Sequence, residues 1–409
     1  MITRKYKQSK YIGLYQGLAF VLLLVNFLVY LNFTLNTFYS SIVIFVNLSV
    51  LILMMLCKGV FTARESKEYL YILTLTLYAS FTLLLTRGGF GSVVSIVLAC
   101  MIMSVFSSVK LTSIKKKVLF LCMLVVFIFW LATSWNYFDR FMTNVDTMMN
   151  SNAVGIIATA LSMYLIAFLN FLEISKNAKK LLGILILLLG FYIVIQAQSR
   201  GALVALAAFA IFNFLIPKKF WKSKKRTSVI FFIIMAGGLL FPWILISFYE
   251  RGTTVTIPFF GVAMFTGREV IWTALLHSLQ SNPINFLFGL GSRYILPGYS
   301  FAHNDYLGLL KHFGLIGFIL FYYFIFKQIK KIYSRNIKIS NTQVTLLMTF
   351  LSFMVLGYFE TIFLSGIFGL ILYMGLAFSI STNPSKKMVS IYQKKRYTSR
   401  FLKPKGVKA

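Results

Sequence analysis

The sequence predicts an all-α, polytopic membrane protein with about 12 transmembrane helices. Hydrophobic residues make up 59% of the 409 residues, whereas charged residues make up only 12%. Apolar runs of about 17–25 residues, the length that spans a bilayer as a helix, recur along the whole chain. These runs are too long to be the alternating segments of about ten residues that build a membrane β-barrel.

We expect a single membrane domain over residues 1–409, in which each apolar run forms one helix and short loops alternate between the two sides. The expected helices cover residues 11–32, 38–57, 69–86, 89–108, 117–135, 153–174, 181–197, 201–216, 228–248, 305–326, 341–358 and 361–380.

Basic residues gather in alternate loops and near both ends of the sequence. Every lysine except Lys311 falls in this set, which the positive-inside rule assigns to the cytoplasm together with both termini. Topology and contact with anionic lipids therefore explain the formal net charge of +32. Nucleic-acid binding is not expected, because the charge follows the loops instead of forming one basic surface.

The opposite, nearly neutral set of loops carries arginine instead of lysine. A guanidinium can bind an oxyanion such as phosphate through two parallel hydrogen bonds, which an ammonium cannot. The alternative for each arginine is an ordinary pair with a carboxylate. The six outer arginines are Arg87, Arg140, Arg200, Arg251, Arg268 and Arg293.

The segment 249–304 is expected to be a large extracytoplasmic loop that contains short helices. Loops of more than about 15 residues in compact proteins are usually functional or disordered, and this one is rich in apolar residues. Thr266 and Glu269 match a capping box, which predicts a helix from about Gly267 to just before Pro283.

Arg268 then falls in the first turn of that helix, where a cation opposes the helix dipole. An anion bound at the same helix start would explain an arginine there. The alternative is a surface pair with Glu269 or Glu250. Arg200, in the segment QSRG between two short expected spans, lies at or slightly below the outer surface. We favour a polar cavity around it over extension to the lipid headgroups.

Polar residues crowd the start of one expected span, in the segment SFAHNDYLGLLKHFG. His303 stands at the junction of loop and helix, where Asn304 or Asp305 can cap the helix. The alternative for His303 is a hydrogen bond that supports this junction. His312 comes nine residues later, on the opposite helix face, and we expect it and His277 to have structural roles.

No metal centre, disulfide or cofactor site is expected. The three cysteines lie in or beside apolar runs, and neither a zinc-protease motif nor a nucleotide-binding glycine loop occurs. The expected spans also lack the mid-membrane acids that ion-coupled transporters usually need.

Three motifs together resemble the O-antigen ligase/polymerase superfamily: SRGAL after a short span, REVIW with a later FGLG, and HNDYLGLL with GLIG at the start of a span. The resemblance implies a GT-C-like fold and a glycosyltransferase that acts on glycans linked to polyprenyl diphosphate. The functional residues of the family match Arg200, Arg268 and His303 here. Arg293 and Asn304 are further candidates for substrate binding.

The implied chemistry agrees with the residue types. Arg200 and Arg268 would bind the diphosphate and stabilise its charge as the glycosidic bond breaks. They would take the place of a metal ion, since the first outer loop lacks the acids of metal-dependent enzymes. His303 would accept the proton of the acceptor hydroxyl. Attack opposite the leaving diphosphate would invert the anomeric centre.

The resemblance leaves the acceptor open. A polymerase transfers the growing chain to the next repeat unit, whereas a ligase transfers a finished glycan to lipid A core or protein. We favour a capsule, exopolysaccharide or O-antigen polymerase in the bacterial cytoplasmic membrane, acting on its outer face, with a flippase and a chain-length regulator as candidate partners. The alternatives of another class are a lipid-linked oligosaccharide flippase, which should show polar groups along several spans, and a non-catalytic scaffold.

Overall fold

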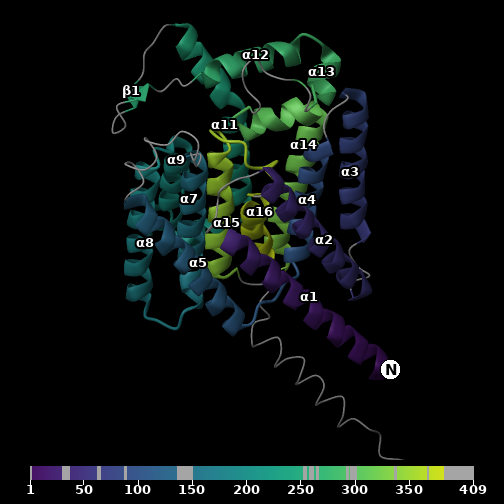
Figure 1. Cartoon of the computed structure of the whole chain (residues 1–409), viewed down its shortest axis with the longest axis vertical. Helices are drawn as coiled ribbons and strands as arrows, with labels where there is room; N and C mark the ends of the chain where they lie inside the picture. Colours follow the sequence, from purple (N-terminus) through teal and green to yellow (C-terminus); the bar gives the residue numbers. More distant parts are fainter. Residues whose placement is uncertain are drawn as a thin grey trace, which may run out of the picture.

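The computed structural model shows a bundle of helices (Figure 1). It describes residues 2–29, 37–61, 66–86, 90–135, 151–251, 256–257, 262–263, 267–291, 294, 302–335, 339–365 and 368–381. Within these residues, 7 helices are long and apolar enough to cross a membrane, and five shorter apolar helices accompany them. The all-α, polytopic class predicted from the sequence is therefore confirmed.

Each expected span corresponds to an apolar helix. In chain order these helices are α1 (Ile2–Val29), α2 (Thr37–Phe61), α3 (Ser66–Thr86), α4 (Phe90–Phe106), α5 (Ser113–Trp135), α7 (Ser151–Phe168), α8 (Lys176–Gln196), α9 (Arg200–Ala210), α11 (Lys224–Glu250), α14 (Asp305–Arg335), α15 (Asn341–Leu356) and α16 (Gly369–Ile380).

Shorter elements connect them. A 3-10 helix (Leu169–Phe171) extends α7, a π-helix (Ile211–Leu215) extends α9, and α10 (Lys218–Trp221) precedes α11. The large loop contains the antiparallel strands β1 (Thr256–Ile257) and β2 (Val262–Ala263), then α12 (Arg268–Gln280) and α13 (Pro283–Phe288).

The core of the bundle is formed by helices that are apolar on every side. Residues 153–169 of α7 and its extension are all buried, and most of α15 and α16 is buried as well. The outer helices keep exposed apolar faces; on α3, for example, Leu84 is 76% exposed. Exposed apolar faces of this extent are expected where helices contact lipid.

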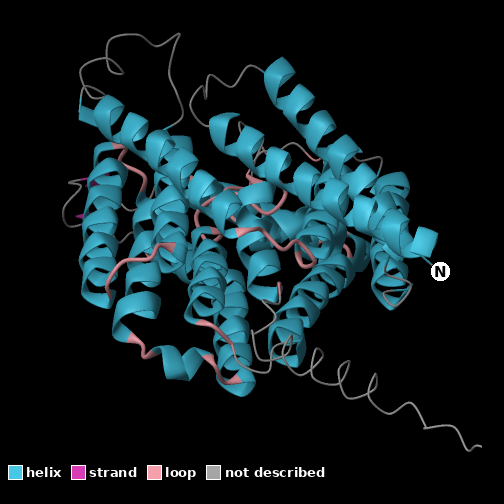
Figure 2. Ribbon diagram, turned by 90° about the horizontal axis from the view of Figure 1, so that it is seen from below, coloured by secondary structure: helices cyan, strands magenta, loops and turns pink. Residues whose placement is uncertain are grey.

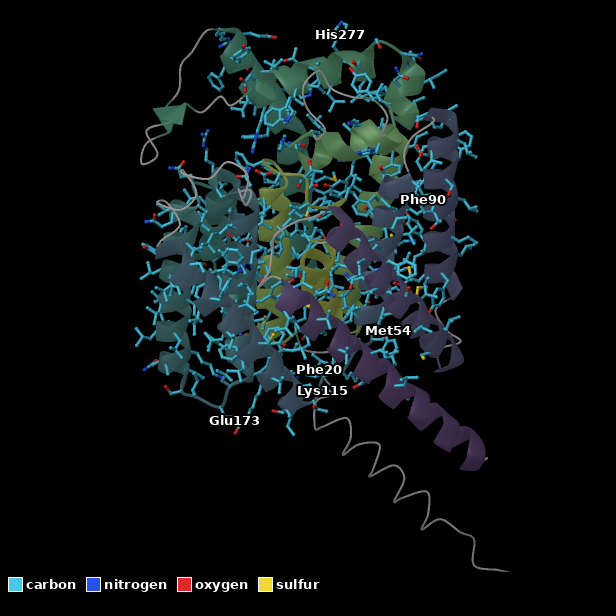
Figure 3. All side chains as sticks on the ribbon, in the orientation of Figure 1. Phe20, Met54, Phe90, Lys115, Glu173 and His277 are labelled. Carbon is cyan, nitrogen blue, oxygen red and sulfur yellow. The ribbon has the colours of Figure 1, made fainter. Side chains whose placement is uncertain are left out.

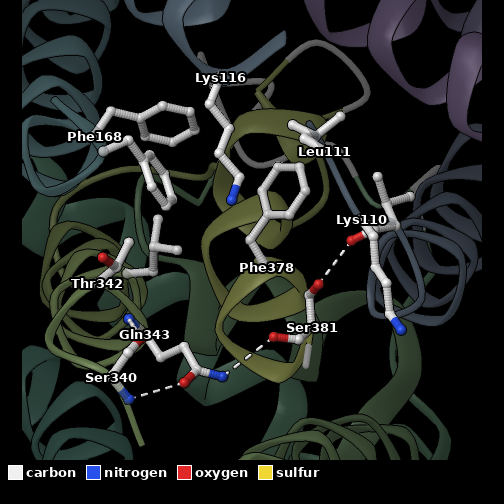
Figure 4. A pocket seen from close by; sticks show the side chains of 12 residues that line it. Lys110, Leu111, Lys116, Phe168, Ser340, Thr342, Gln343, Phe378 and Ser381 are labelled. Carbon is white, nitrogen blue, oxygen red and sulfur yellow. Dashed lines mark hydrogen bonds between the residues drawn. The ribbon is translucent and has the colours of Figure 1, made fainter. Parts of the chain in front are cut away.

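The two ends of the bundle differ. We call the end that carries α12 and α13 the loop end, and the opposite end, where Lys115 and Glu173 lie, the basic end (Figure 3). Seen from the basic end, short loops join neighbouring helices (Figure 2). There the Gln343 side chain donates to the carbonyls of Ser379 and Ser381, and Ser381 Oγ donates to Val109 O, which ties the ends of α4, α15 and α16 together (Figure 4).

The expected span 305–326 is wrong in one respect, because α14 is interrupted at Gly314. This residue has φ 61° and ψ −171°, a conformation that is essentially restricted to glycine. A Cβ at Gly314 would come within 2.3 Å of the Leu287 backbone, so α13 packs directly on the break. The carbonyl of Lys311, freed from the helix, accepts from the amides of Leu290 and Gly291.

The expected span 361–380 begins too early, because α16 starts only at Gly369. Residues 361–365, before α16, are not helical and are held by Asp305, which is fully buried. Asp305 Oδ1 accepts from the amides of Ile362 and Phe363, both at 2.8 Å, and its own amide donates to Gly357 O. Irregular backbone at membrane depth is tolerated where protein satisfies its polar groups, as it does here.

Replacing Asp305 by alanine is expected to lower the free energy of unfolding by about 1–3 kcal/mol for each amide left without an acceptor. Asp305→Asn keeps one oxygen and should lose less. Thermal unfolding of the purified variants in detergent measures the difference. Equal stability of the two variants would show that the carboxylate does not hold the segment before α16.

Candidate functional site

Four segments meet at the loop end: the start of α9, the start of α12, the junction before α14 and the turn that follows α15. They bring together residues that are up to 160 positions apart in the chain, from Arg200 to Glu360. The polar side chains of this cluster come from backbone positions fixed by helix starts and tight turns.

Arg268 is the first residue of α12. The preceding Gly267 is the N-cap and has φ 82°, and the Glu269 side chain accepts from its amide. The helix thus begins as expected, but its cap is Gly267 and not Thr266, which lies outside the described residues. The guanidinium of Arg268 donates to Phe359 O at 2.6 Å and to Glu360 Oε1 at 2.8 Å.

Glu360 connects Arg268 to His303. Its side chain is 8% exposed; one oxygen binds Arg268, and the other, Oε2, lies 3.7 Å from Nδ1 of His303. A carboxylate beside one imidazole nitrogen orients the ring and stabilises it when protonated, as in a catalytic triad. The opposite nitrogen, Nε2, then remains for a substrate.

His303 adopts a left-handed backbone conformation, with φ 46°. Such a conformation is uncommon for a residue other than glycine and is maintained only by its surroundings. Trp272 Nε1 of α12 donates to Ala302 O on one side of His303. On the other side, Asn304 Oδ1 accepts from Leu307 N and its amide donates to Tyr358 O. The imidazole itself stays 31% exposed.

Arg200 begins α9 and is partly buried. The segment around it fits tightly: a Cβ on Gly201 would come within 2.6 Å of the Phe359 side chain, and one on Gly155 would overlap Ser199. This packing places the start of α9 against the turn whose carbonyl binds Arg268. The charge of Arg268 acts on Arg200, so two guanidinium groups lie within electrostatic range of each other. Like charges held together in this way favour the binding of an anion.

Residues 184–322 match a protein family described as O-Antigen ligase. This segment contains Arg200, Arg268 and His303. The match covers about a third of the chain and supports its resemblance to the O-antigen ligase/polymerase superfamily. A search of curated proteins gave no match. The O-antigen ligase segment ends within α14, so Glu360, which joins Arg268 to His303, lies beyond it.

The structure places the other residues singled out from the sequence as follows. Arg293 lies outside the described residues. Asn304 is fully buried and uses both ends of its amide to fix the start of α14. His312 Nδ1 lies 3.0 Å from Ser92 Oγ, and His277 is exposed on α12, as Figure 3 shows.

The sequence analysis missed Glu360 as part of the site. It was placed correctly at a turn between two apolar helices, but an acid flanked by apolar residues was not recognised as a partner for the arginines of the candidate site. Its position between two apolar runs was the available signal, because a carboxylate there needs a cation. Among the described residues, no group of three or more His, Cys, Asp or Glu side chains could hold a metal ion.

Proposed function

We propose that this protein is a polysaccharide polymerase. It transfers a growing glycan from a polyprenyl diphosphate to a hydroxyl of the next lipid-linked repeat unit, on the outer face of the bacterial cytoplasmic membrane. The observation that carries the proposal is the cluster in which Glu360 bridges Arg268 and His303, with Arg200 in electrostatic range. It combines a site for an anion with a base, and glycosyl transfer from a diphosphate needs both.

In the proposed reaction the acceptor oxygen bonds to the anomeric carbon while His303 Nε2 takes the hydroxyl proton. The bond between the anomeric carbon and the diphosphate oxygen breaks, and its electron pair leaves with the diphosphate. Arg200 and Arg268 stabilise the charge that develops there. A guanidinium has five N–H donors, so Arg268 keeps donors for the diphosphate beyond those that bind Phe359 O and Glu360.

Glu360 is a positioning residue for both Arg268 and His303. It holds the Arg268 guanidinium against the turn after α15, and it faces the imidazole nitrogen that does not meet the acceptor. When His303 takes up the proton, the carboxylate stabilises the imidazolium. The separation of 3.7 Å is long for a hydrogen bond, and such contacts often shorten once substrate is bound.

Gel analysis of surface glycan distinguishes the polymerase from the alternatives. Cells lacking the gene should carry single repeat units, and the wild-type gene should restore long chains. Long chains that remain attached to the polyprenyl carrier would instead identify a ligase. Unchanged surface glycan would contradict both forms of glycosyl transfer. Inversion at the anomeric centre is tested by NMR of the product; retention of configuration would contradict direct attack on the diphosphate.

A further inference from the structure

A cavity lined in part by polar residues lies at the basic end, the opposite end of the bundle from the site described above. It has a volume of about 270 Å³, close to the lower end of the range for ligand pockets, which begins at roughly 300 Å³. The extension of α7, the start of α8, the π-helix and the start of α15 line it. Its polar lining residues are Asn170, Lys179, Lys180, Asn213, Lys218 and Thr345.

Lys218 is the central residue of this cavity. Its ammonium donates to Oδ1 of Asn213 and, at 2.8 Å, to Oγ1 of Thr345. Both acceptors are neutral. In the part of the chain that the structure describes, no carboxylate forms an ion pair with Lys218. Burial, and then the charge of Lys222, lowers the pKa of Lys218 to about 8.

The other charged side chains that line this cavity are also positive. Lys179 and Lys180 are the fourth and fifth residues of α8, near the helix start, where cations oppose the helix dipole and an anion would be favoured. The acid nearest in sequence, Glu173, is 84% exposed and pairs with Lys117 at 3.4 Å. The positive-inside rule explains lysines on this end, but it does not explain an ammonium drawn into a cavity.

The π-helix shapes the wall of the cavity. Segments of this kind are rare and often occur at functional sites. Here the π-helix supplies Asn213 to Lys218 and presents Phe214 to the cavity. Leu181 and Leu215, which follow the lining residues Lys180 and Phe214 in the chain, are 69% and 74% exposed. An apolar surface next to a cluster of lysines suits a molecule with a charged head and apolar chains.

We propose that this lysine cavity binds a phosphate anion. Lys179, Lys180 and Lys218 supply the positive charge, and the exposed leucines favour a phosphate carried as the headgroup of an anionic lipid over free phosphate. The cavity lies at the opposite end of the bundle from Arg268 and His303, so the phosphate bound there is not the diphosphate of the transfer reaction. A lipid at this position would hold α7, α8 and α15 together.

Binding is tested on the purified full-length protein by native mass spectrometry with phosphatidylglycerol, phosphatidylcholine or inorganic phosphate. We expect one phosphatidylglycerol to bind more tightly than phosphatidylcholine. Each lysine near a membrane surface contributes about 1 kcal/mol, so Lys218→Ala should weaken binding about fivefold and a Lys179→Ala/Lys180→Ala double variant about 25-fold. Displacement of the lipid by millimolar inorganic phosphate would identify free phosphate as a ligand of the same site.

Lys116→Ala is the matched control. Lys116 lies in a neighbouring, much smaller hollow at the same end and is 4.3 Å from the centre of the Phe171 ring, so its loss should leave lipid binding unchanged (Figure 4). If Lys218→Ala fails to fold, the double variant still decides, because neither of its side chains takes part in the Lys218 hydrogen bonds. Equal binding of both lipids, or equal loss in the Lys116→Ala control, would overturn the proposal. Neither readout depends on glycan transfer.

Discussion

Replacing His303 by alanine is expected to lower the rate of glycan transfer by about 10²–10⁴-fold, the usual contribution of a general base. The left-handed backbone at this position fixes where the imidazole points, and Glu360 faces its Nδ1. Transfer is measured as the appearance of long glycan chains in cells that lack the native gene and express the variant at wild-type level.

His277→Ala is the matched control for this prediction, because His277 is an exposed histidine on the helix that covers the same end of the bundle. It should transfer glycan at the wild-type rate. His303→Gln keeps a polar side chain but cannot act as a base, so it should fail like alanine. Long chains of normal abundance with His303→Ala would contradict the assignment of His303 as the base, whatever the family relationship.

Arg268→Lys is expected to lower transfer by about 10²–10³-fold, the effect of losing one donor to a developing negative charge. Lysine keeps the positive charge but cannot bridge Phe359 O and Glu360 as the planar guanidinium does. The readout is the same glycan assay, combined with the amount of folded protein in the membrane. That second measurement is needed because loss of a partly buried pair also reduces stability.

Arg251→Ala provides the comparison for the arginine. Arg251 is exposed just after α11, so its replacement changes the charge of the loop segment without touching the cluster around Glu360. A requirement for net positive charge alone would leave Arg268→Lys active and would reduce transfer in Arg251→Ala. Loss of transfer in Arg268→Lys only, with normal amounts of folded protein, supports bidentate recognition of the diphosphate.

Most of the fold was accessible from the sequence, because length and hydropathy determine where a helix can cross a membrane. The start of α12 was also predicted, from the capping-box pattern of Thr266 and Glu269, although the N-cap in the structure is Gly267. The two helix predictions that were wrong depended on contacts between segments that are distant in the sequence. The break at Gly314 comes from α13 packing on α14, and the late start of α16 comes from the side chain of Asp305.

In the candidate site, too, local features were visible in the sequence and contacts between distant segments were not. Arg200, Arg268 and His303 became candidates because each stands at a recognisable boundary between loop and helix. Glu360 was missed because its role exists only once the turn after α15 lies against α12, and no local pattern encodes that distance. The sequence around His303 also could not show that the Asn304 side chain fixes the start of α14, where its oxygen accepts from Leu307 N and its nitrogen donates to Tyr358 O.

The link from Asp305 to the amides of residues 362 and 363 has a consequence for biogenesis. A membrane protein is inserted as it is synthesised, and its N-terminal parts fold first. Arg200, Arg268 and His303 enter the membrane before the turn with Glu360 exists. Only when residues 360–363 have been synthesised can Asp305 dock that turn and Glu360 join the arginine to the histidine. A chain that stops after residue 322 would contain the whole O-antigen ligase segment and still lack a completed centre.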